Sequence, residues 1–419
     1  MSKAMVISVG TGKEGADIAK AICLSIKQQN PDSVIFIVSK ISQEKTMPFI
    51  RENIAVHNRT SQERLLSDEN NVEQIEIECV AFLKELLTKG FLPEDIIIDF
   101  TSGTKAMSVG IVLAGLNLQG INLSYITGRR NHEGRVISGE EVIIIQTPNR
   151  IFFNSIFKDS IYLFNKYQFD TCFDLISQAK NLLSDVEYLQ KADTLEKLAQ
   201  AYSFWEKFNQ PNAFQILKDL TTGSAYTKYL LEWGIKGVIE KNKQILYQEQ
   251  ENNYSPERVV DLLENASRRA EEGKFDDAVA RLYRLMEYLA QYQLFNKYHQ
   301  IKTECLEINQ LPVEVQLKYN KLKNKDGKIN ISLYQAYDLL KDLNDELGKK
   351  FISEYNEKDS KIRKLLIIRN NSILAHGFGP INKEQYQSLR NIVDDYVKIA
   401  VDNDELLKKN VRFPKVKIF

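Results

Sequence analysis

The sequence lacks several features that mark broad classes of protein. Its four cysteines, Cys23, Cys79, Cys172 and Cys305, are scattered and form no CxxC pair, which argues against a zinc site or a disulfide framework. No apolar run approaches the ~18 residues that a membrane span needs. The N-terminus leads directly into an apolar strand, without the pattern of a signal peptide. We therefore expect a cytoplasmic protein with reduced core cysteines and no membrane contact.

The sequence also lacks an excess of charge of either sign. Lys and Arg together number 56, as do Asp and Glu, so the formal net charge is zero. This balance excludes a general polyanion-binding surface, and any contact with RNA must come from a local patch. The length of 419 residues is enough for two or three domains, each with its own core.

Strands and helices alternate over the first third of the chain. Such alternation predicts an α/β Rossmann-like domain at 1–150, with a mostly parallel sheet and helices on both faces. Strands are expected at Met5–Val9, Val34–Val38, Ile96–Phe100, Leu123–Tyr125 and Val142–Gln146, and helices at Gly15–Gln28, Ile75–Leu87 and Thr104–Leu118. Ligands of such folds bind at the carboxyl ends of the strands.

The first candidate ligand loop follows the first strand and runs from Ser8 to Gly15. Its glycines match GxGxxG, the dinucleotide fingerprint. The second strand, however, ends in Val38-Ser39-Lys40 and lacks the acid that would bind a ribose. A tight glycine turn is one interpretation, and a loop that presents backbone N–H groups to a phosphate or adenosine ligand is the other. Thr11 and Gly12 are the candidate contacts.

The second candidate loop follows the third expected strand, at Asp99-Phe-Thr-Ser-Gly-Thr-Lys-Ala-Met107. Hydroxyls, a glycine and a lysine at a helix start can cradle a phosphate, so Ser102, Gly103, Thr104 and Lys105 are candidate ligand contacts. The loop has no Walker A spacing. The alternative is a plain helix N-cap. A third element, 127–132, is either a further pocket edge or a solvated hairpin tip.

The strand pattern stops after Pro148, and the rest of the chain is predicted to be helical. A polar stretch before Ser255-Pro256 predicts a boundary between a middle segment, 151–255, and a C-terminal domain, 256–419. Helices are expected at Ser155–Tyr167, Asp170–Leu183, Tyr188–Phe208, Asn212–Asp219, Ala225–Gln248, Pro256–Glu272, Asp276–Tyr298, Ser332–Leu347 and Ser353–His376.

The most informative motif is Arg369-Asn-Asn-Ser-Ile-Leu-Ala-His376. The pattern around it predicts one helix from Lys361 to His376, ended by Gly377. On such a helix Arg369 and His376 share a face, about 10 Å apart along the axis. A permanent cation beside a group that titrates near neutrality suits chemistry on a phosphodiester. The alternative is a chance pair, with His376 placed in a last helical turn.

A second cluster of charges lies in the segment Arg281-Leu-Tyr-Arg284-Leu-Met-Glu287. The simplest interpretation is a solvated helix face held by salt bridges of little energetic value. The other is a basic strip that contacts RNA phosphates beside Arg369 and His376.

Together these motifs resemble the CRISPR-associated ancillary ribonucleases of type III systems, which join an N-terminal CARF domain to a C-terminal HEPN domain. The loop 101–107 is similar to the CARF ligand loop, and Arg369 to His376 fits the HEPN pattern of Arg, four to six residues, then His, with Asn370 after the Arg. The segment 275–284 is similar to the first HEPN helices of one branch of this family. The segment 150–255 is matched only in being helical.

The resemblance implies a function and a set of partners. A CARF homodimer would bind a cyclic tetra- or hexa-adenylate across its two-fold axis through Thr11, Gly12, Ser102, Gly103, Thr104 and Lys105. The ring would activate a composite HEPN dimer site that cuts single-stranded RNA without a metal cofactor. In that site Arg369 would stabilise phosphate charge, His376 would act on the 2′-OH or the leaving oxygen, and Asn370 would position Arg369 or a phosphate. Some CARF domains also cut their ring, and Ser102, Thr104 and Lys105 would then hold its 2′-OH.

Three other functions compete with this one. GxGxxG favours a nicotinamide-dependent oxidoreductase, although the acid for the ribose and a catalytic set in the helical half are missing. A ligand-sensing α/β domain can also drive a helical partner-binding domain without catalysis, and a toxin-like HEPN ribonuclease can sense another nucleotide. The sequence leaves the ring size open.

Overall fold

The chain forms two compact units, Met1–Ser155 and Ile156–Phe419. The computed structural model describes residues 2–12, 15–53, 59–129, 136, 141–326 and 328–417. The last three residues of the third predicted element, 130–132, lie outside this described part. The division predicted at 255 stays a prediction.

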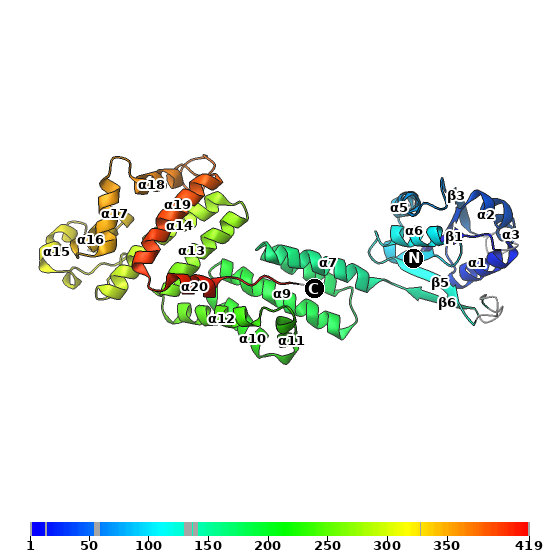
Figure 1. The fold of residues 1–419 in the computed structure, drawn as a ribbon, viewed down its shortest axis with the longest axis horizontal. Helices are drawn as coiled ribbons and strands as arrows, with labels where there is room; N and C mark the ends of the chain where they lie inside the picture. Colours follow the sequence, from blue (N-terminus) through cyan, green and yellow to red (C-terminus); the bar gives the residue numbers. More distant parts are fainter. Residues whose placement is uncertain are drawn as a thin grey trace. The chain divides into compact units, whose positions relative to one another are not determined.

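The first unit is built on a six-stranded sheet of order β3-β2-β1-β4-β5-β6 (Figure 1). All neighbouring strands are parallel except β5 and β6, which are antiparallel. The predicted α/β fold with a mostly parallel sheet is therefore confirmed. The strands are β1 (Ala4–Val9), β2 (Ser33–Val38), β3 (Thr60–Leu65), β4 (Ile96–Asp99), β5 (Asn122–Thr127) and β6 (Val142–Gln146).

Alternate residues of the central strands face two separate cores. Val6, Ile35 and Ile98 point to one face, where they pack against α5 (Val72–Thr88) and α6 (Lys105–Gly115). Ile7, Phe36 and Ile97 point to the other, against α1 (Ala16–Gln29) and α3 (Met47–Arg51). Helices cover both faces, so the strands read as continuous apolar runs.

An edge strand and two short helices of this unit, one of which is α3, were not expected from the sequence. The edge strand β3 has the sequence Thr-Ser-Gln-Glu-Arg-Leu, whose side chains are exposed or half-buried. It pairs with β2 through its backbone and carries no apolar signal. The short helix α2 (Lys40–Lys45) follows β2 directly, and Ser39 starts it with a capping box to Ser42. Ser39, at the end of β2, therefore caps a helix where a dinucleotide-binding fold has an acid.

The second unit is entirely helical over the residues described, as predicted. None of its helices that the structure describes is both long and apolar enough to cross a membrane. The helices are α7 (Asn149–Asn165), α8 (Phe169–Lys180), α9 (Val186–Glu206), α10 (Gln210–Thr222), α11 (Ser224–Glu232), α12 (Lys236–Glu251), α13 (Pro256–Glu271), α14 (Phe275–Lys297), α15 (Val313–Asn320), α16 (Leu333–Asp342), α17 (Glu346–Asn356), α18 (Lys361–Asn370), α19 (Lys383–Ala400) and α20 (Asp404–Val411).

Three helices that the sequence predicted as continuous are broken, and the one expected at Ser353–His376 is interrupted between Asn356, the end of α17, and Lys361, the start of α18. The helix expected at Ala225–Gln248 divides into α11 and α12 at Gly234, which has φ of 68°. The helix expected at Ser332–Leu347 divides into α16 and α17 at Asn344, which has φ of 65°. Asp345 then caps α17 by accepting a hydrogen bond from the Leu347 N–H (2.9 Å). Gly and Asn residues in the left-handed conformation commonly end helices. The spacing of apolar residues does not predict where they do so.

The cysteines are unpaired, and three of them lie in the cores. Burial raises the pKa of Cys23 to about 11 and that of Cys79 to about 12, so both thiols stay protonated at neutral pH. The expectation of core cysteines is wrong for Cys305, which is exposed.

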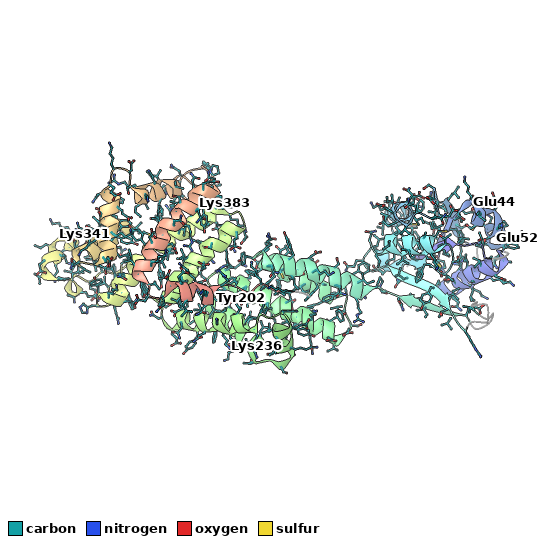
Figure 2. The ribbon with its side chains drawn as sticks, viewed as in Figure 1. Glu44, Glu52, Tyr202, Lys236, Lys341 and Lys383 are labelled. Atoms are coloured by element: carbon teal, nitrogen blue, oxygen red, sulfur yellow. The ribbon has the colours of Figure 1, made fainter. Side chains whose placement is uncertain are left out.

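A C-terminal tail, residues 412–417, fastens α20 to the first helices of the second unit. Phe413 is buried among aromatic rings, with centroid distances of 4.7 Å to Tyr202 and 4.9 Å to Trp205 (Figure 2 labels Tyr202). The Arg268 guanidinium lies 3.8 Å from the centroid of the same ring. Asn165 closes the contact with two hydrogen bonds to the backbone of Val416, both of 2.8 Å.

Truncation of the Phe413 ring should destabilise the helical unit strongly. We expect Phe413→Ala to lower its free energy of unfolding by about 3–5 kcal/mol, because loss of the ring leaves a cavity that the surrounding side chains cannot fill. Tyr162→Ala is the matched control, since that ring is 63% exposed and its loss should cost no more than ~0.5 kcal/mol. Denaturant unfolding followed by tryptophan fluorescence measures both, and equal stability of the two variants would contradict the packing described.

Candidate functional sites

The two candidate ligand loops lie side by side where the strand order reverses. The sheet runs from β1 to β2 and β3 in one direction and from β1 to β4 and β5 in the other. The loops after β1 and β4 therefore leave neighbouring strands at the topological switch point, where open α/β folds bind ligands. The sequence prediction placed both loops correctly at the carboxyl ends of strands.

Direct contacts hold the two loops together. The Ser8 hydroxyl donates to the Ser102 carbonyl, and the Ser102 hydroxyl donates to the Ser8 carbonyl (2.5 Å). The Gly10 N–H also donates to the Ser102 hydroxyl (3.2 Å). A Cβ on Gly10 would lie 2.5 Å from the Gly103 nitrogen, so only glycine allows the backbones to come this close.

A buried carboxylate fixes the base of the second loop. Asp99 is 1% exposed and accepts hydrogen bonds from the Ser25 hydroxyl (2.6 Å) and the Thr101 N–H (2.9 Å). The Thr101 hydroxyl in turn accepts a bond from the Ile126 N–H on β5 (2.9 Å). Asp99 was not predicted from the sequence as a residue of the site. The sequence did place Asp99 between an apolar strand and the candidate loop, and this position could have indicated that its side chain supports the loop.

The predicted ligand contacts differ in what the structure leaves accessible. Ser102 is buried, and its hydroxyl is used between the loops. The Thr104 hydroxyl caps α6 by accepting from the Met107 N–H (3.1 Å) and donates to the Glu69 carbonyl (2.9 Å). Thr104, Lys105 and Gly12 are exposed. The hydroxyls of Ser102 and Thr104 are thus used within the protein, while the exposed Lys105 lies in the first turn of α6, the end of a helix that attracts anions.

The Arg369–His376 motif is not one continuous helix, which corrects the prediction for 361–376. Helix α18 ends at Asn370, and Asn371 is its C-cap. The Ser372 hydroxyl donates to the Arg369 carbonyl (2.8 Å). Asn and Ser compete with helical hydrogen bonds in this way, which is the physical reason why the helix stops. Arg369 therefore lies in the last turn of α18, and His376 lies on the loop that follows.

The loop after α18 folds back on the end of the helix. The His376 N–H donates to the Asn370 carbonyl (3.1 Å), and the Gly379 N–H donates to the Asn371 carbonyl (2.9 Å). A Cβ on Gly377 would collide with the Asn371 carbonyl, so the turn requires glycine there. These bonds keep the exposed His376 beside the end of α18 although the two are not helical neighbours.

The Arg369 side chain is held by an aromatic ring from another helix. Its guanidinium carbon lies 4.4 Å from the centroid of the Tyr283 ring on α14, and its Nη1 donates to the Asn370 side-chain oxygen (3.0 Å). Burial raises the pKa of Tyr283; the nearby Glu287 adds to this rise and Arg369 opposes it. Tyr283 was not predicted as a neighbour of Arg369, because no local sequence pattern links α14 to α18.

The other charges around Tyr283 form salt bridges. Arg281 pairs with Asp277 and donates to Asn265, and Arg284 lies 3.6 Å from Glu287. The structure favours the simpler interpretation of this segment, with Tyr283 as the residue that reaches Arg369.

Apolar side chains surround the Arg369–His376 segment at the surface. Ile373 is 64% exposed and Phe378 is 90% exposed, and Ile367 and Leu374 are exposed as well. Such a group of exposed apolar side chains is unusual on a monomer surface. Within the described residues, no group of three or more His, Cys, Asp or Glu side chains could hold a metal ion.

Comparison with known proteins supports these assignments of fold. Residues 248–400 match the family described as the Csm6 HEPN domain. A solved structure of Enterococcus italicus Csm6 bound to cyclic hexa-2′-fluoro-hexa-dAMP is similar over 98% of this chain and 100% of that one, with a TM-score of 0.55 and 14% identity. A type III CRISPR defence DNA nuclease activated by cyclic oligoadenylate aligns over 31% of this chain and 19% of that one, with 18% identity and a TM-score of only 0.24. A search of curated proteins gave no match.

The chain thus joins an α/β domain to a helical unit, and residues 248–400 of that unit, which contain the Arg369–His376 motif, match the family described as the Csm6 HEPN domain. The predicted resemblance to the CARF–HEPN ancillary proteins of type III CRISPR systems is confirmed.

The close contact between the two ligand loops can be tested by a single methyl group. We expect Gly10→Ala to destabilise the N-terminal unit by about 1–3 kcal/mol, because its Cβ overlaps the Gly103 backbone. Gly237→Ala, where a Cβ meets no atom within 4 Å, should keep or slightly raise stability. Thermal unfolding of both variants measures this, and an unchanged midpoint for Gly10→Ala would rule out the contact.

Proposed function

We propose that this protein is a metal-independent endoribonuclease of type III CRISPR defence that cuts single-stranded RNA when a cyclic oligoadenylate binds its N-terminal domain. The observation that carries the proposal is that Arg369, packed on Tyr283, and His376 lie together within the stretch that matches the Csm6 HEPN family. The fold of the whole chain, shared with a Csm6, supports the N-terminal half of the proposal. The cytoplasm is the compartment that suits both ligands.

The activator would bind at the switch point of the sheet. Lys105, the first turn of α6 and the loop with Thr11 and Gly12 offer a cation and backbone N–H groups to phosphates. Gly103 would admit the ring close to the backbone, and Ser102 would act mainly by holding the two loops together. The Enterococcus italicus neighbour is bound to a cyclic ligand of six nucleotides, so cyclic hexa-adenylate is the first ligand to test. Ring cleavage by this domain stays a prediction.

The chemistry would be attack of a ribose 2′-OH on the adjacent phosphorus. A 2′,3′-cyclic phosphate forms, the bond to the 5′ oxygen breaks, and that oxygen takes up a proton. Arg369 would stabilise the extra negative charge on phosphorus. His376 would remove the 2′ proton or protonate the leaving oxygen. Asn370 would orient Arg369 through the hydrogen bond described above.

We further propose that the active form is a homodimer. The exposed apolar side chains Ile367, Ile373, Leu374 and Phe378 surround the motif, and a second copy would bury them. A two-fold axis through this face would bring two Arg369–His376 sets together, which suits a composite site.

Cleavage of a fluorogenic single-stranded RNA in EDTA tests the proposed function. We expect wild type to cut only with cyclic tetra- or hexa-adenylate, and His376→Ala to lose about 10²–10⁴-fold in rate because its proton transfer is gone. His299→Ala removes another exposed histidine of the same unit and should retain activity.

Two results would count against the proposal. Absence of cleavage with either ring would favour a ligand-sensing regulatory protein without catalysis. Cleavage that survives in His376→Ala would move the chemistry to other residues.

The role of Tyr283 as a positioning residue predicts a graded response. Tyr283→Leu removes the ring face under Arg369 and should lower kcat with little change in KM, by roughly 2- to 30-fold for a cation–π contact of about 0.5–2 kcal/mol. Tyr283→Phe keeps the face and should restore most of kcat. Steady-state kinetics on the same RNA measures this, and equal loss in both variants would assign the effect to the hydroxyl group instead.

A further inference from the structure

A stretch of the chain that is basic and free of acidic residues contains the Arg369–His376 motif. Residues 360–383 include five Lys and Arg and no Asp or Glu, in a protein whose net charge is zero. Four of the five are exposed, and Arg363 among them lies over the Tyr355 ring. The other three are Lys361, Lys364 and Lys383, and within the described part of the chain none of them forms an ion pair. Their charge is therefore available to a polyanion.

Two of these lysines line a groove between α18 and α19. Its volume is about 290 Å³, and Lys361 and Lys364 stand along its α18 side. Its floor is apolar, with Ile368, Leu389 and Ile392. Gln385 and Ser388 add polar groups from α19, and Glu384 is the one acid of the lining. Lys383, labelled in Figure 2, is the first residue of α19 and precedes this lining.

The groove and the proposed catalytic residues share helix α18. Ile368, on its floor, directly precedes Arg369, and Lys361 lies seven residues further back, or about 10 Å along the helix. A strand whose reacting phosphate lies at Arg369 can thus reach the groove with its flanking nucleotides.

We propose that the α18–α19 groove binds the single-stranded RNA that flanks the cleaved bond, with phosphates on Lys361 and Lys364 and an unstacked base on the apolar floor. This rests on the proposed function for the identity of the polyanion. Cations beside a surface that accepts the flat face of a base are the features by which proteins hold single strands without sequence preference. A duplex keeps its bases stacked and cannot place one on the floor.

Binding of a labelled single-stranded RNA, followed by fluorescence anisotropy over a series of salt concentrations, tests the groove. The full chain with His376→Ala is used, so that the RNA stays intact. Lys361→Gln/Lys364→Gln should lower the salt slope by about 1.4 and weaken binding roughly 25-fold at about 0.1 M salt, because two phosphate contacts are lost. Lys323→Gln/Lys325→Gln removes two exposed lysines from the loop after α15 and should bind like the parent.

The outcomes separate the groove from the proposed function. Equal weakening by both lysine pairs, or none by the groove pair, would overturn the assignment. A change in particle mass by light scattering in the groove variant, with RNA binding per protomer intact, would assign the groove to a second copy and also overturn it. If wild type never cuts RNA, the proposed function fails, while the binding series still decides the groove.

Discussion

The end of helix α18 at Asn370 is the constraint on which the proposed ribonuclease site depends. Had the helix continued to His376, Arg369 and His376 would lie on one straight helix, and the loop that now follows Asn370 would not form. Because Asn371 and Ser372 stop the helix, the chain turns back on itself and keeps His376 hydrogen-bonded to Asn370. The same turn exposes the apolar side chains and brings α19 beside α18.

Electrostatics in this protein is local. The zero net charge hides an acid-free stretch around the motif, whereas the buried Arg268 pairs with Glu206 and Asp261. In the described part of the ligand loops, the hydroxyls of Ser8, Ser102 and Thr104 bond within the protein, and Lys105 presents an exposed positive charge. Exposed cations on a chain of zero net charge therefore act through their local surroundings.

Much of the fold followed from the sequence because apolar periodicity reports burial. The inner strands and most helices were predicted for this reason, whereas the polar edge strand β3 gives no such signal. The breaks at Gly234 and Asn344 depend on single left-handed residues inside periodic patterns. For the sites, the loops and the motif were found as sequence features, but the contact of Arg369 with Tyr283 and the use of Ser102 inside the loops are tertiary facts. The spacing of residues along the chain does not reveal these two contacts.

The tail that carries Phe413 has a consequence for how the protein is made. The residues that contact the tail are translated long before it; they are Asn165, Tyr202 and Trp205. The aromatic cluster that surrounds Phe413 therefore stays incomplete until the tail has been translated. During synthesis, α18 and α19 therefore emerge before Phe413 can fill the space beside Tyr202 and Trp205. Because Phe413 is synthesised after α18 and α19, the aromatic core of the helical unit can close only after the proposed ribonuclease site has been translated.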